Sequence, residues 1–274
     1  MRSLILSALV LSLAGLPAAA LAGEASPWSS VDGAAVRLLP GDAGNKGFAG
    51  LEIKLDEGWK TYWRNPGDAG IPPRFDWSKS ENLGDVAVVW PAPTRLDDEG
   101  GTTAVYTGDV LMPLRVTPAD PSKPVRLALS IDYGICHQIC VPVKSEVELT
   151  LAPDDNKGEG AEAIADAVKR APTVEPPSSP SPFKISQFQL DTSTRPATVT
   201  IDVSSPSPAW LFVEGPPKWY LPMPNPAPDA DKANPQKFVL QLDGLPKNTT
   251  LGGHELRFTL STGQTGVERV YQLP

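Results

Sequence analysis

Two cysteines and a histidine make up the stretch of this chain best suited to chemistry. Cys136 and Cys140 are the two cysteines of the sequence, and His137 lies between them. Two thiols this close can form and break a disulfide, and a neighbouring imidazole can lower a thiol pKa and so favour the nucleophilic thiolate. The pattern predicts thiol–disulfide chemistry at Cys136 and Cys140, with His137 as a modulator of their pKa. This interpretation needs no cofactor beyond the redox-active disulfide.

Two other interpretations of the same residues stay open. A bridge that closes so short a loop removes only about 2 kcal/mol of unfolded-state freedom, against about 3 kcal/mol for a 15-residue loop, but it could still serve to stiffen a tip. Alternatively, Cys136, His137 and Cys140 could supply three ligands to zinc. Soft ligands suit copper(I), to which the two cysteines and Met112 could contribute.

The residues that flank the cysteines alternate between apolar and polar. The apolar positions on the two sides are Val125, Leu127, Leu129, Ile131 and Tyr133 upstream and Val141, Val143, Val147, Leu149 and Leu151 downstream. A period of two on both sides predicts a β-hairpin with the cysteines at its tip, on the polar face of the pattern. Facing residues of an antiparallel pair lie about 4.5–5.5 Å apart at Cα, which is close to what a disulfide needs.

The N-terminus predicts export. Residues 1–22 combine Arg2, an apolar stretch over residues 4–16 and a small-residue cleavage site at residues 20–22, as in a secretory signal peptide. We expect the exported protein to reside in the periplasm, where disulfides persist. No later segment reaches 18 consecutive apolar residues, so we expect a protein that does not span a membrane. The net charge of −8 argues against nucleic acid and anionic membrane as partners.

Strand patterns and proline predict the domain organisation. Thirty-one prolines and 23 glycines punctuate short alternating segments. Residues 23–152 and 183–274 each predict a β-sandwich, and residues 153–182 predict a helix followed by a Pro-rich linker. The fold class is therefore all-β, with two immunoglobulin-like antiparallel β-sandwiches joined by a short helix and a Pro-rich linker. The helix is indicated by Ala161, Ile164, Ala165 and Val168, with a cap at Asp154, Asp155 or Asn156.

Aromatic residues gather in both predicted sandwiches. Trp59, Trp63, Trp77 and Trp90 favour packing over a ligand cage. In the second sandwich, residues 210–213 predict a buried strand. Residues 219–224 predict a proline-rich loop that packs onto the first domain, with an exposed aromatic docking surface as the alternative. The sequence contains no GxSxG, P-loop, GxGxxG or HExxH motif, so hydrolase, nucleotide-binding and zincin chemistry have no support.

Several motifs in order carry a resemblance to a known family. They are residues 58–70 (GWKTYWRNPGDAG), 75–77 (FDW), 90–93 (WPAP), 116–120 (VTPAD) and 132–142 (DYGICHQICVP). Much of residues 48–151 resembles the N-terminal immunoglobulin-like domain of the DsbD thiol:disulfide interchange proteins, in particular the ScsB-type branch associated with copper tolerance. Residues 211–216 are similar to the following immunoglobulin-like domain of that branch.

The resemblance implies a function and its residues. It implies that Cys136 and Cys140 are the redox pair, that Cys140 is the cysteine attacked in a mixed disulfide, and that thioredoxin-like periplasmic proteins are the clients. Family members shield the pair with an aromatic cap loop, whereas the corresponding cap-like loop here, Asp97, Asp98, Glu99, Gly100 and Gly101, has no aromatic residue. The sequence shows neither the family's membrane conductor nor its thioredoxin-like domain, so the resemblance implies a separate membrane thiol reductase as electron donor.

Three functions remain to be distinguished. The first is a thiol:disulfide carrier of the protein-disulfide reductase type. The second is a copper-binding or copper-tolerance module that uses Cys136, His137 and Cys140. The third is a non-catalytic immunoglobulin-like interaction protein in which the disulfide is structural.

Overall fold

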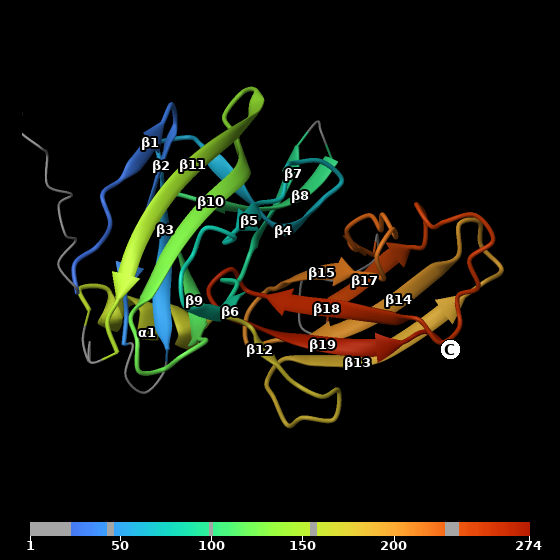
Figure 1. Cartoon of the computed structure of the whole chain (residues 1–274). Coiled ribbons are helices and arrows are strands. Elements are labelled where there is room, and N and C mark those ends of the chain that lie inside the picture. Colours follow the sequence, from blue (N-terminus) through green and yellow to red (C-terminus); the bar gives the residue numbers. More distant parts are fainter. Residues whose placement is uncertain (1–22, 43–46, 99–100, 154–157, 228–235) are drawn as a thin grey trace, which may run out of the picture.

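The chain folds into two β-sandwiches that lie side by side (Figure 1). This computed structural model describes residues 23–42, 47–98, 101–153, 158–227 and 236–274. The predicted signal peptide, residues 1–22, lies outside the described residues. The predicted fold class, all-β with two antiparallel sandwiches, is confirmed.

The first sandwich pairs a five-stranded sheet of order β1-β2-β3-β9-β6 with a second sheet of order β11-β10-β4-β8-β7, in which β5 also pairs with β10. Its strands are β1 (Ser29–Val31), β2 (Ala34–Pro40), β3 (Phe48–Leu55), β4 (Lys60–Gly67), β5 (Arg74–Asp76), β6 (Leu83–Val88), β7 (Thr94–Asp98), β8 (Gly101–Thr107), β9 (Val110–Pro118), β10 (Val125–Cys136) and β11 (Cys140–Leu151).

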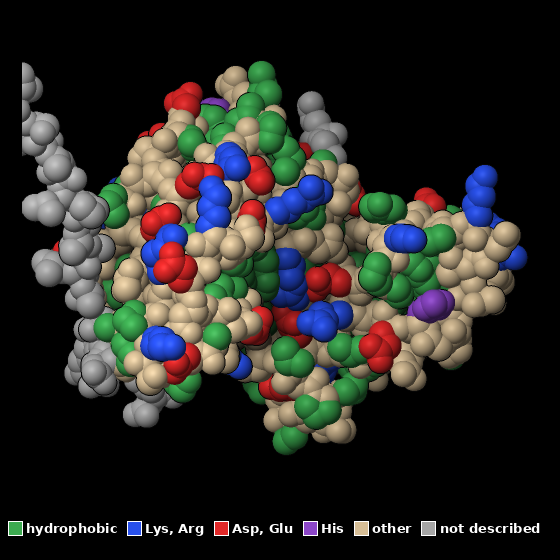
Figure 2. Space-filling view, in the orientation of Figure 1, with side chains coloured by type: hydrophobic (Ala, Val, Ile, Leu, Met, Phe, Trp, Pro, Cys, Tyr) green, Lys and Arg blue, Asp and Glu red, His purple; other side chains and the backbone are tan. Residues whose placement is uncertain are grey.

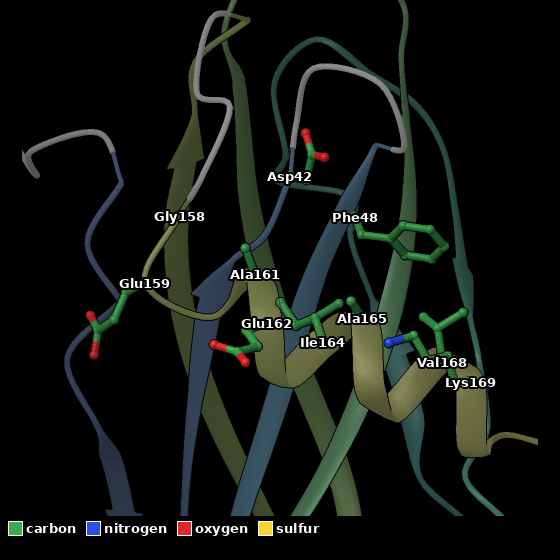
Figure 3. Close-up of a pocket in the computed structure, with 10 residues that line it drawn as sticks. All are labelled: Asp42, Phe48, Gly158, Glu159, Ala161, Glu162, Ile164, Ala165, Val168 and Lys169. Atoms are coloured by element: carbon green, nitrogen blue, oxygen red, sulfur yellow. The ribbon is translucent and has the colours of Figure 1, made fainter.

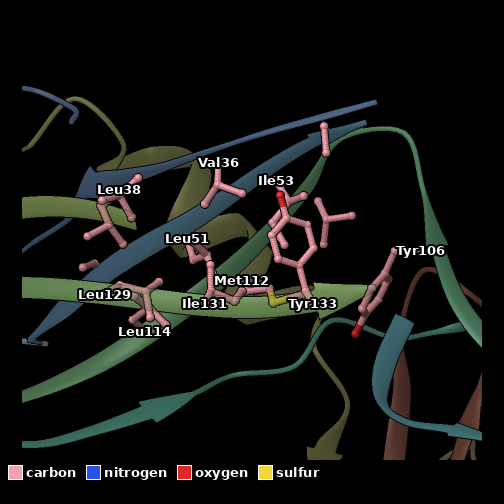
Figure 4. Packing of buried hydrophobic residues seen from close by; sticks show 14 of the residues in the cluster. Val36, Leu38, Leu51, Ile53, Tyr106, Met112, Leu114, Leu129, Ile131 and Tyr133 are labelled. Carbon is pink, nitrogen blue, oxygen red and sulfur yellow. The ribbon is translucent and has the colours of Figure 1, made fainter. Parts of the chain in front are cut away.

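The core of this sandwich lies between the two sheets. Figure 4 shows Leu51, Met112 and Ile131 meeting there beside Tyr133, and each is at most 1 % exposed. Burying a side chain of this size contributes about 1.5–3 kcal/mol. The predicted packing role of the tryptophans is confirmed, because Trp63 is buried in this core and the other three pack against its edge.

The predicted hairpin forms as β10 and β11. Its register runs without a break from Val125 opposite Leu151 to Cys136 opposite Cys140. The odd-numbered residues of β10 enter the core, because successive side chains of a strand point to opposite faces. The hairpin rises to one end of the first sandwich, where its tip stands clear of the sheets (Figure 1).

The predicted helix forms as α1 (Ala161–Arg170) and packs across β3 and β9, on the outer face of the five-stranded sheet. Ile164 is buried, and it lies so close to Gly50 of β3 that a Cβ there would come within 3.0 Å of its side chain. The predicted capping residues are wrong. The N-cap is Gly160, which makes no side-chain cap, and residues 154–156 lie outside the described residues. Its basic last turn, Lys169 and Arg170, suits the helix dipole.

The second sandwich consists of two four-stranded sheets of order β12-β19-β18-β15 and β13-β14-β17-β16. Its strands are β12 (Thr173–Val174), β13 (Lys184–Asp191), β14 (Thr198–Ser204), β15 (Trp210–Glu214), β16 (Asn225–Pro226), β17 (Gln236–Gln241), β18 (Glu255–Ser261) and β19 (Gly266–Gln272). Its core is separate from the first and is built on alternate residues of these strands, such as Val199, Ile201 and Val203.

The Pro-rich segment is attached to the second sandwich instead of spanning free space. Thr173 and Val174 pair in parallel with β19. Arg269, which is 1 % exposed, bonds the Glu175 carboxylate at 3.1 Å and the carbonyl of Ser179 at 3.3 Å. Extended proline-rich chain keeps its carbonyls free, and here a buried guanidinium binds them.

The two sandwiches share a packed interface. Leu211 and Val213 enter the second core, while Phe212 between them belongs to the first core and lies 5.6 Å from Trp63, ring centre to ring centre. Trp210 is 36 % exposed, so the predicted buried strand is correct only for residues 211–213.

Charged groups and a loop complete the interface. Arg64 of β4 bonds Glu214 at 2.7 Å and Glu268 at 2.6 Å. The loop that precedes β16 packs onto the first domain as predicted, since Met223 is buried in the first core, whereas Tyr220 is 81 % exposed. Among the described residues, no helix has the length and apolar character needed to cross a membrane.

Candidate functional site

A disulfide joins Cys136 and Cys140 at the tip of the β10–β11 hairpin. The two residues are cross-strand partners with their Cα atoms 4.0 Å apart. Cys136 is 4 % exposed, whereas Cys140 is exposed. Cys140 is therefore the more accessible residue of the pair, and Cys136 is covered.

The shielding of Cys136 corrects the expectation that both cysteines lie on a polar face. Cys136 does point away from the main core, but the outer face of the sheet is covered at this end. Tyr62 and Val105 are buried with it in a small separate cluster, against which Leu96 packs. The alternation predicts direction correctly, but it cannot show what the neighbouring strands place on the same face.

Tyr62 makes a direct contact with the disulfide. Its hydroxyl oxygen lies 3.0 Å from Sγ of Cys140, and because a disulfide sulfur carries no hydrogen, the hydroxyl is the donor. Burial raises the pKa of Tyr62, and the negative charge of Asp98 raises it further. The hydroxyl therefore keeps its proton at neutral pH. After reduction it can donate to the Cys140 thiolate, and such a bond lowers a thiol pKa.

The pairing of β4 with β10 positions this tyrosine. Thr61 lies opposite Ile135, and the Thr61 hydroxyl donates to the carbonyl of Gly134 at 2.8 Å. Gly134 lacks the Cβ that would otherwise lie 3.1 Å from the Tyr62 ring and 2.7 Å from Cβ of Ile71. The glycine of the hairpin motif thus leaves the space that the tyrosine ring occupies.

The described residues of the cap-like loop, Asp97, Asp98 and Gly101, lie at the adjoining ends of β7 and β8, beside the site. Asp98 pairs with Gly101, and residues 99–100 lie outside the described residues. The Asp98 carboxylate binds the ammonium of Lys60 at 2.9 Å, and Lys60 is the cross-strand partner of Cys136. An acidic residue of the loop is thereby held next to the shielded cysteine.

His137 is exposed and directed toward the turn before β4. Its ring lies 5.8 Å from that of Trp59, and a Cβ on Gly58 would meet Nε2 at 2.7 Å. The role of His137 as a pKa modulator stays a prediction. Tyr62 was not identified from the sequence. The signal available was its place two residues after Lys60, since residues two apart on a strand share one face of the sheet.

The metal alternative requires reduced cysteines, because both sulfurs are bonded to each other here. Within the described residues, no three His, Cys, Asp or Glu side chains are grouped so that they could hold a metal ion. Met112 is fully buried in the first core and is not part of this site. Copper(I) binding by the reduced pair stays a prediction.

The two hydrophobic residues that flank Cys140 in the chain are exposed. Ile139 is 75 % exposed and Val141 is 36 % exposed, and both belong to the hairpin tip. Figure 2 shows hydrophobic atoms gathered at this end of the first sandwich. Exposed apolar residues around a reactive group are typical of a surface that another protein covers.

A hollow lies between α1 and the start of β3, away from the hairpin tip (Figure 3). Phe48 of β3 faces Val168 of α1 across it, with Ile164 in its floor and Glu162 and Lys169 near its rim. Its lining contains no cysteine or histidine. The thiol chemistry therefore belongs to the hairpin tip.

Comparisons with known proteins agree with this geometry. Residues 31–152 match the family model described as "Thiol:disulfide interchange protein DsbD, N-terminal". The fold is similar to the N-terminal periplasmic domain of ScsB from Proteus mirabilis, with a TM-score of 0.67 and 20 % identity over 91 % of this chain and 98 % of that chain.

The reduced DsbD N-terminal domain of Neisseria meningitidis is matched with a TM-score of 0.28 and 20 % identity over 42 % of this chain and 83 % of that chain. No curated protein sequence matches this chain. The family resemblance predicted from the sequence motifs is confirmed over residues 31–152.

Proposed function

We propose, from the premise that residues 31–152 are a DsbD/ScsB-type N-terminal domain, that this protein is a periplasmic thiol:disulfide interchange protein. It passes reducing equivalents through Cys136 and Cys140 to thioredoxin-like clients. The observation that supports this most strongly is the asymmetry of the bond, with an exposed Cys140 that contacts Tyr62 and a buried Cys136. The periplasmic location is supported by the predicted signal peptide and by the description of the similar ScsB domain.

The exchange balances as two successive thiol–disulfide steps. In the reduced protein, the Cys140 thiolate attacks one sulfur of a client disulfide, which forms a mixed disulfide and releases one client thiolate. Cys136 then loses its proton and attacks Sγ of Cys140, which restores the internal disulfide and releases the second client thiolate. The protein is oxidised by two electrons and the client is reduced by two.

The neighbouring residues fit these steps. The Tyr62 hydroxyl stabilises the Cys140 thiolate that begins the exchange. Ile139 and Val141 provide apolar contact area for the client beside the reacting sulfur. When a reduced donor reloads the protein by attacking Cys140, Cys136 leaves as a thiolate on the strand position that faces Lys60. We expect a membrane thiol reductase to be that donor.

A trapping experiment with two matched variants tests this function. The Cys136→Ser protein keeps the exposed thiol and should form a mixed disulfide with a thioredoxin-fold partner that lacks its resolving cysteine. The Cys140→Ser protein keeps the buried thiol and should form little. If neither variant is trapped by any thioredoxin-fold partner, or both are trapped equally, the proposed function is wrong.

A further inference from the structure

The β7–β8 hairpin stands between the disulfide and the second sandwich. β7 is the edge strand of its sheet and pairs on one side with β8. Leu96 packs on the Tyr62–Cys136 cluster, and Asp98 binds Lys60. These contacts hold one face of β7 against the site. Arg95 lies on the other face of the strand and connects it to the second sandwich.

Arg95 of β7 connects the ends of β7 and β8 to the second sandwich. Its side chain is 4 % exposed. Within the hairpin, Nε bonds the Asp97 carboxylate at 3.0 Å and Nη2 bonds the Thr102 hydroxyl at 2.9 Å. Across the domain boundary, Nη1 bonds the carbonyl of Pro224 at 2.6 Å and Nη2 bonds Oδ1 of Asn225 at 2.7 Å.

Further contacts make this junction rigid. The guanidinium lies over the Trp210 ring, 5.5 Å from its centre. The Thr102 hydroxyl donates to Asp97 at 2.6 Å, and the Thr102 amide donates to Asp68 at 2.9 Å. A planar guanidinium can serve several acceptors at once in this way, whereas an ammonium cannot. Removing Arg95 would leave several acceptors at a buried junction without their donor.

We propose that the second sandwich positions the end of β7 beside the disulfide, and that Arg95 is the positioning residue that connects them. Arg95 fixes the adjoining ends of β7 and β8, which keeps Leu96 and Asp98 over the side of Cys136. Cys136 stays covered, so an incoming thiolate reaches Cys140. The consequence for exchange with clients rests on the proposed function, whereas the covering of Cys136 does not.

Alkylation of the reduced full chain measures this covering directly. A small alkylating reagent is applied, and mass spectrometry gives the labelling rates of Cys136 and Cys140 separately. Arg95→Ala should raise the Cys136 rate relative to the Cys140 rate about fivefold, the effect of losing one to two buried hydrogen bonds on a local opening equilibrium. Asn225→Ala, which alters only the second sandwich, should raise it about twofold. Arg95→Lys should lie between wild type and Arg95→Ala.

Arg269→Ala is the matched control. Arg269 is also a buried arginine bound to one carboxylate and to backbone carbonyls, but its bonds run to the Pro-rich segment. It should lower the melting temperature of the protein and leave the labelling ratio unchanged. If Arg95→Ala leaves the ratio at the wild-type value, or Arg269→Ala raises it as much, the proposal is overturned.

The role of Arg95 and the proposed function can be tested independently of each other. Should Arg95→Ala fail to fold, Asn225→Ala decides, because it leaves the first sandwich unchanged, and an unaltered ratio then rejects the proposal. Should the wild-type protein exchange with no thioredoxin-fold partner, the proposed function fails, and the labelling ratio still decides the role of Arg95.

Discussion

The hydroxyl of Tyr62 lies 3.0 Å from Sγ of Cys140, across two strands that are 78 residues apart in the chain. It is a buried donor that contacts the sulfur of the more exposed cysteine of the disulfide. Because burial and the charge of Asp98 both keep this hydroxyl protonated, it stabilises a thiolate better than a thiol. The first prediction follows from this relationship.

Tyr62→Phe should raise the pKa of the Cys140 thiol. A hydrogen bond to a charged group contributes about 1.5–3 kcal/mol, and one pKa unit corresponds to about 1.4 kcal/mol, so we expect a rise of about one to two units. The pH dependence of Cys140 alkylation in the reduced protein measures it. Tyr133→Phe is the control, since the Tyr133 hydroxyl bonds Ser145 inside the sandwich. An unchanged Cys140 pKa in Tyr62→Phe would show that the contact has no chemical role.

Gly134→Ala should destabilise the hairpin and displace Tyr62. The added Cβ would lie 2.7 Å from Cβ of Ile71 and 3.1 Å from the Tyr62 ring, and overpacking of this kind costs about 1–3 kcal/mol. Urea unfolding gives the loss of stability, and the alkylation profile of Cys140 gives the loss of the hydroxyl contact. A variant as stable as wild type with an unchanged profile would rule out this role for the glycine.

The pKa of the Asp97 carboxyl should rise when Arg95 is replaced. The hydrogen bond from Arg95 lowers the pKa of Asp97; burial works against this, and the bond from Thr102 lowers the pKa further. A lowered folded-state pKa means that the interaction stabilises the fold above the ordinary carboxyl range and is lost as the pH falls through the lowered value. Arg95→Gln should raise the pKa of Asp97 in an NMR titration, while Asp191, whose pKa is lowered by Ser193, should not change. An unchanged pKa of Asp97 would contradict the hydrogen bond between Arg95 and Asp97.

Arg64→Ala should strongly weaken the contact between the sandwiches. It leaves Glu268, which is 5 % exposed, and Glu214 without this partner, and breaking a buried pair costs about 3–5 kcal/mol. Arg257 also contacts Glu268, at 3.4 Å, but its side chain is 49 % exposed. Arg257→Ala should therefore cost at most about 1 kcal/mol. Thermal unfolding of both variants checks this, and equal losses would contradict it.

Local patterns predicted the elements of this fold but could not predict the contacts of its site. The alternation on both sides of Cys136 predicts the hairpin, because a period of two is typical of half-buried strands. The partners of Arg95 in the second sandwich are Pro224 and Asn225, about 130 residues further along the chain. A pattern of neighbouring residues cannot predict a contact over that sequence separation. The helix cap was placed wrongly because Asp and Asn favour caps in general, whereas this helix begins after Gly160.

The same limit applies to Tyr62. The sequence shows that Tyr62 is an aromatic residue on the same strand face as Lys60. It does not show the register of β4 against β10, in which Thr61 lies opposite Ile135. Only that register brings the hydroxyl to Cys140. The cysteines themselves are recognisable from their spacing, whereas the residues that tune them come from other strands.

The reduction potential of the Cys136–Cys140 pair tests the central claim most directly. The folded protein is equilibrated with glutathione buffers of defined potential, and the two thiols are quantified by alkylation. A carrier that exchanges electrons with thioredoxin-like proteins should have a potential above about −300 mV. A potential below that value, with a bond that no reductant opens in the folded protein, would contradict the account and leave a structural bridge.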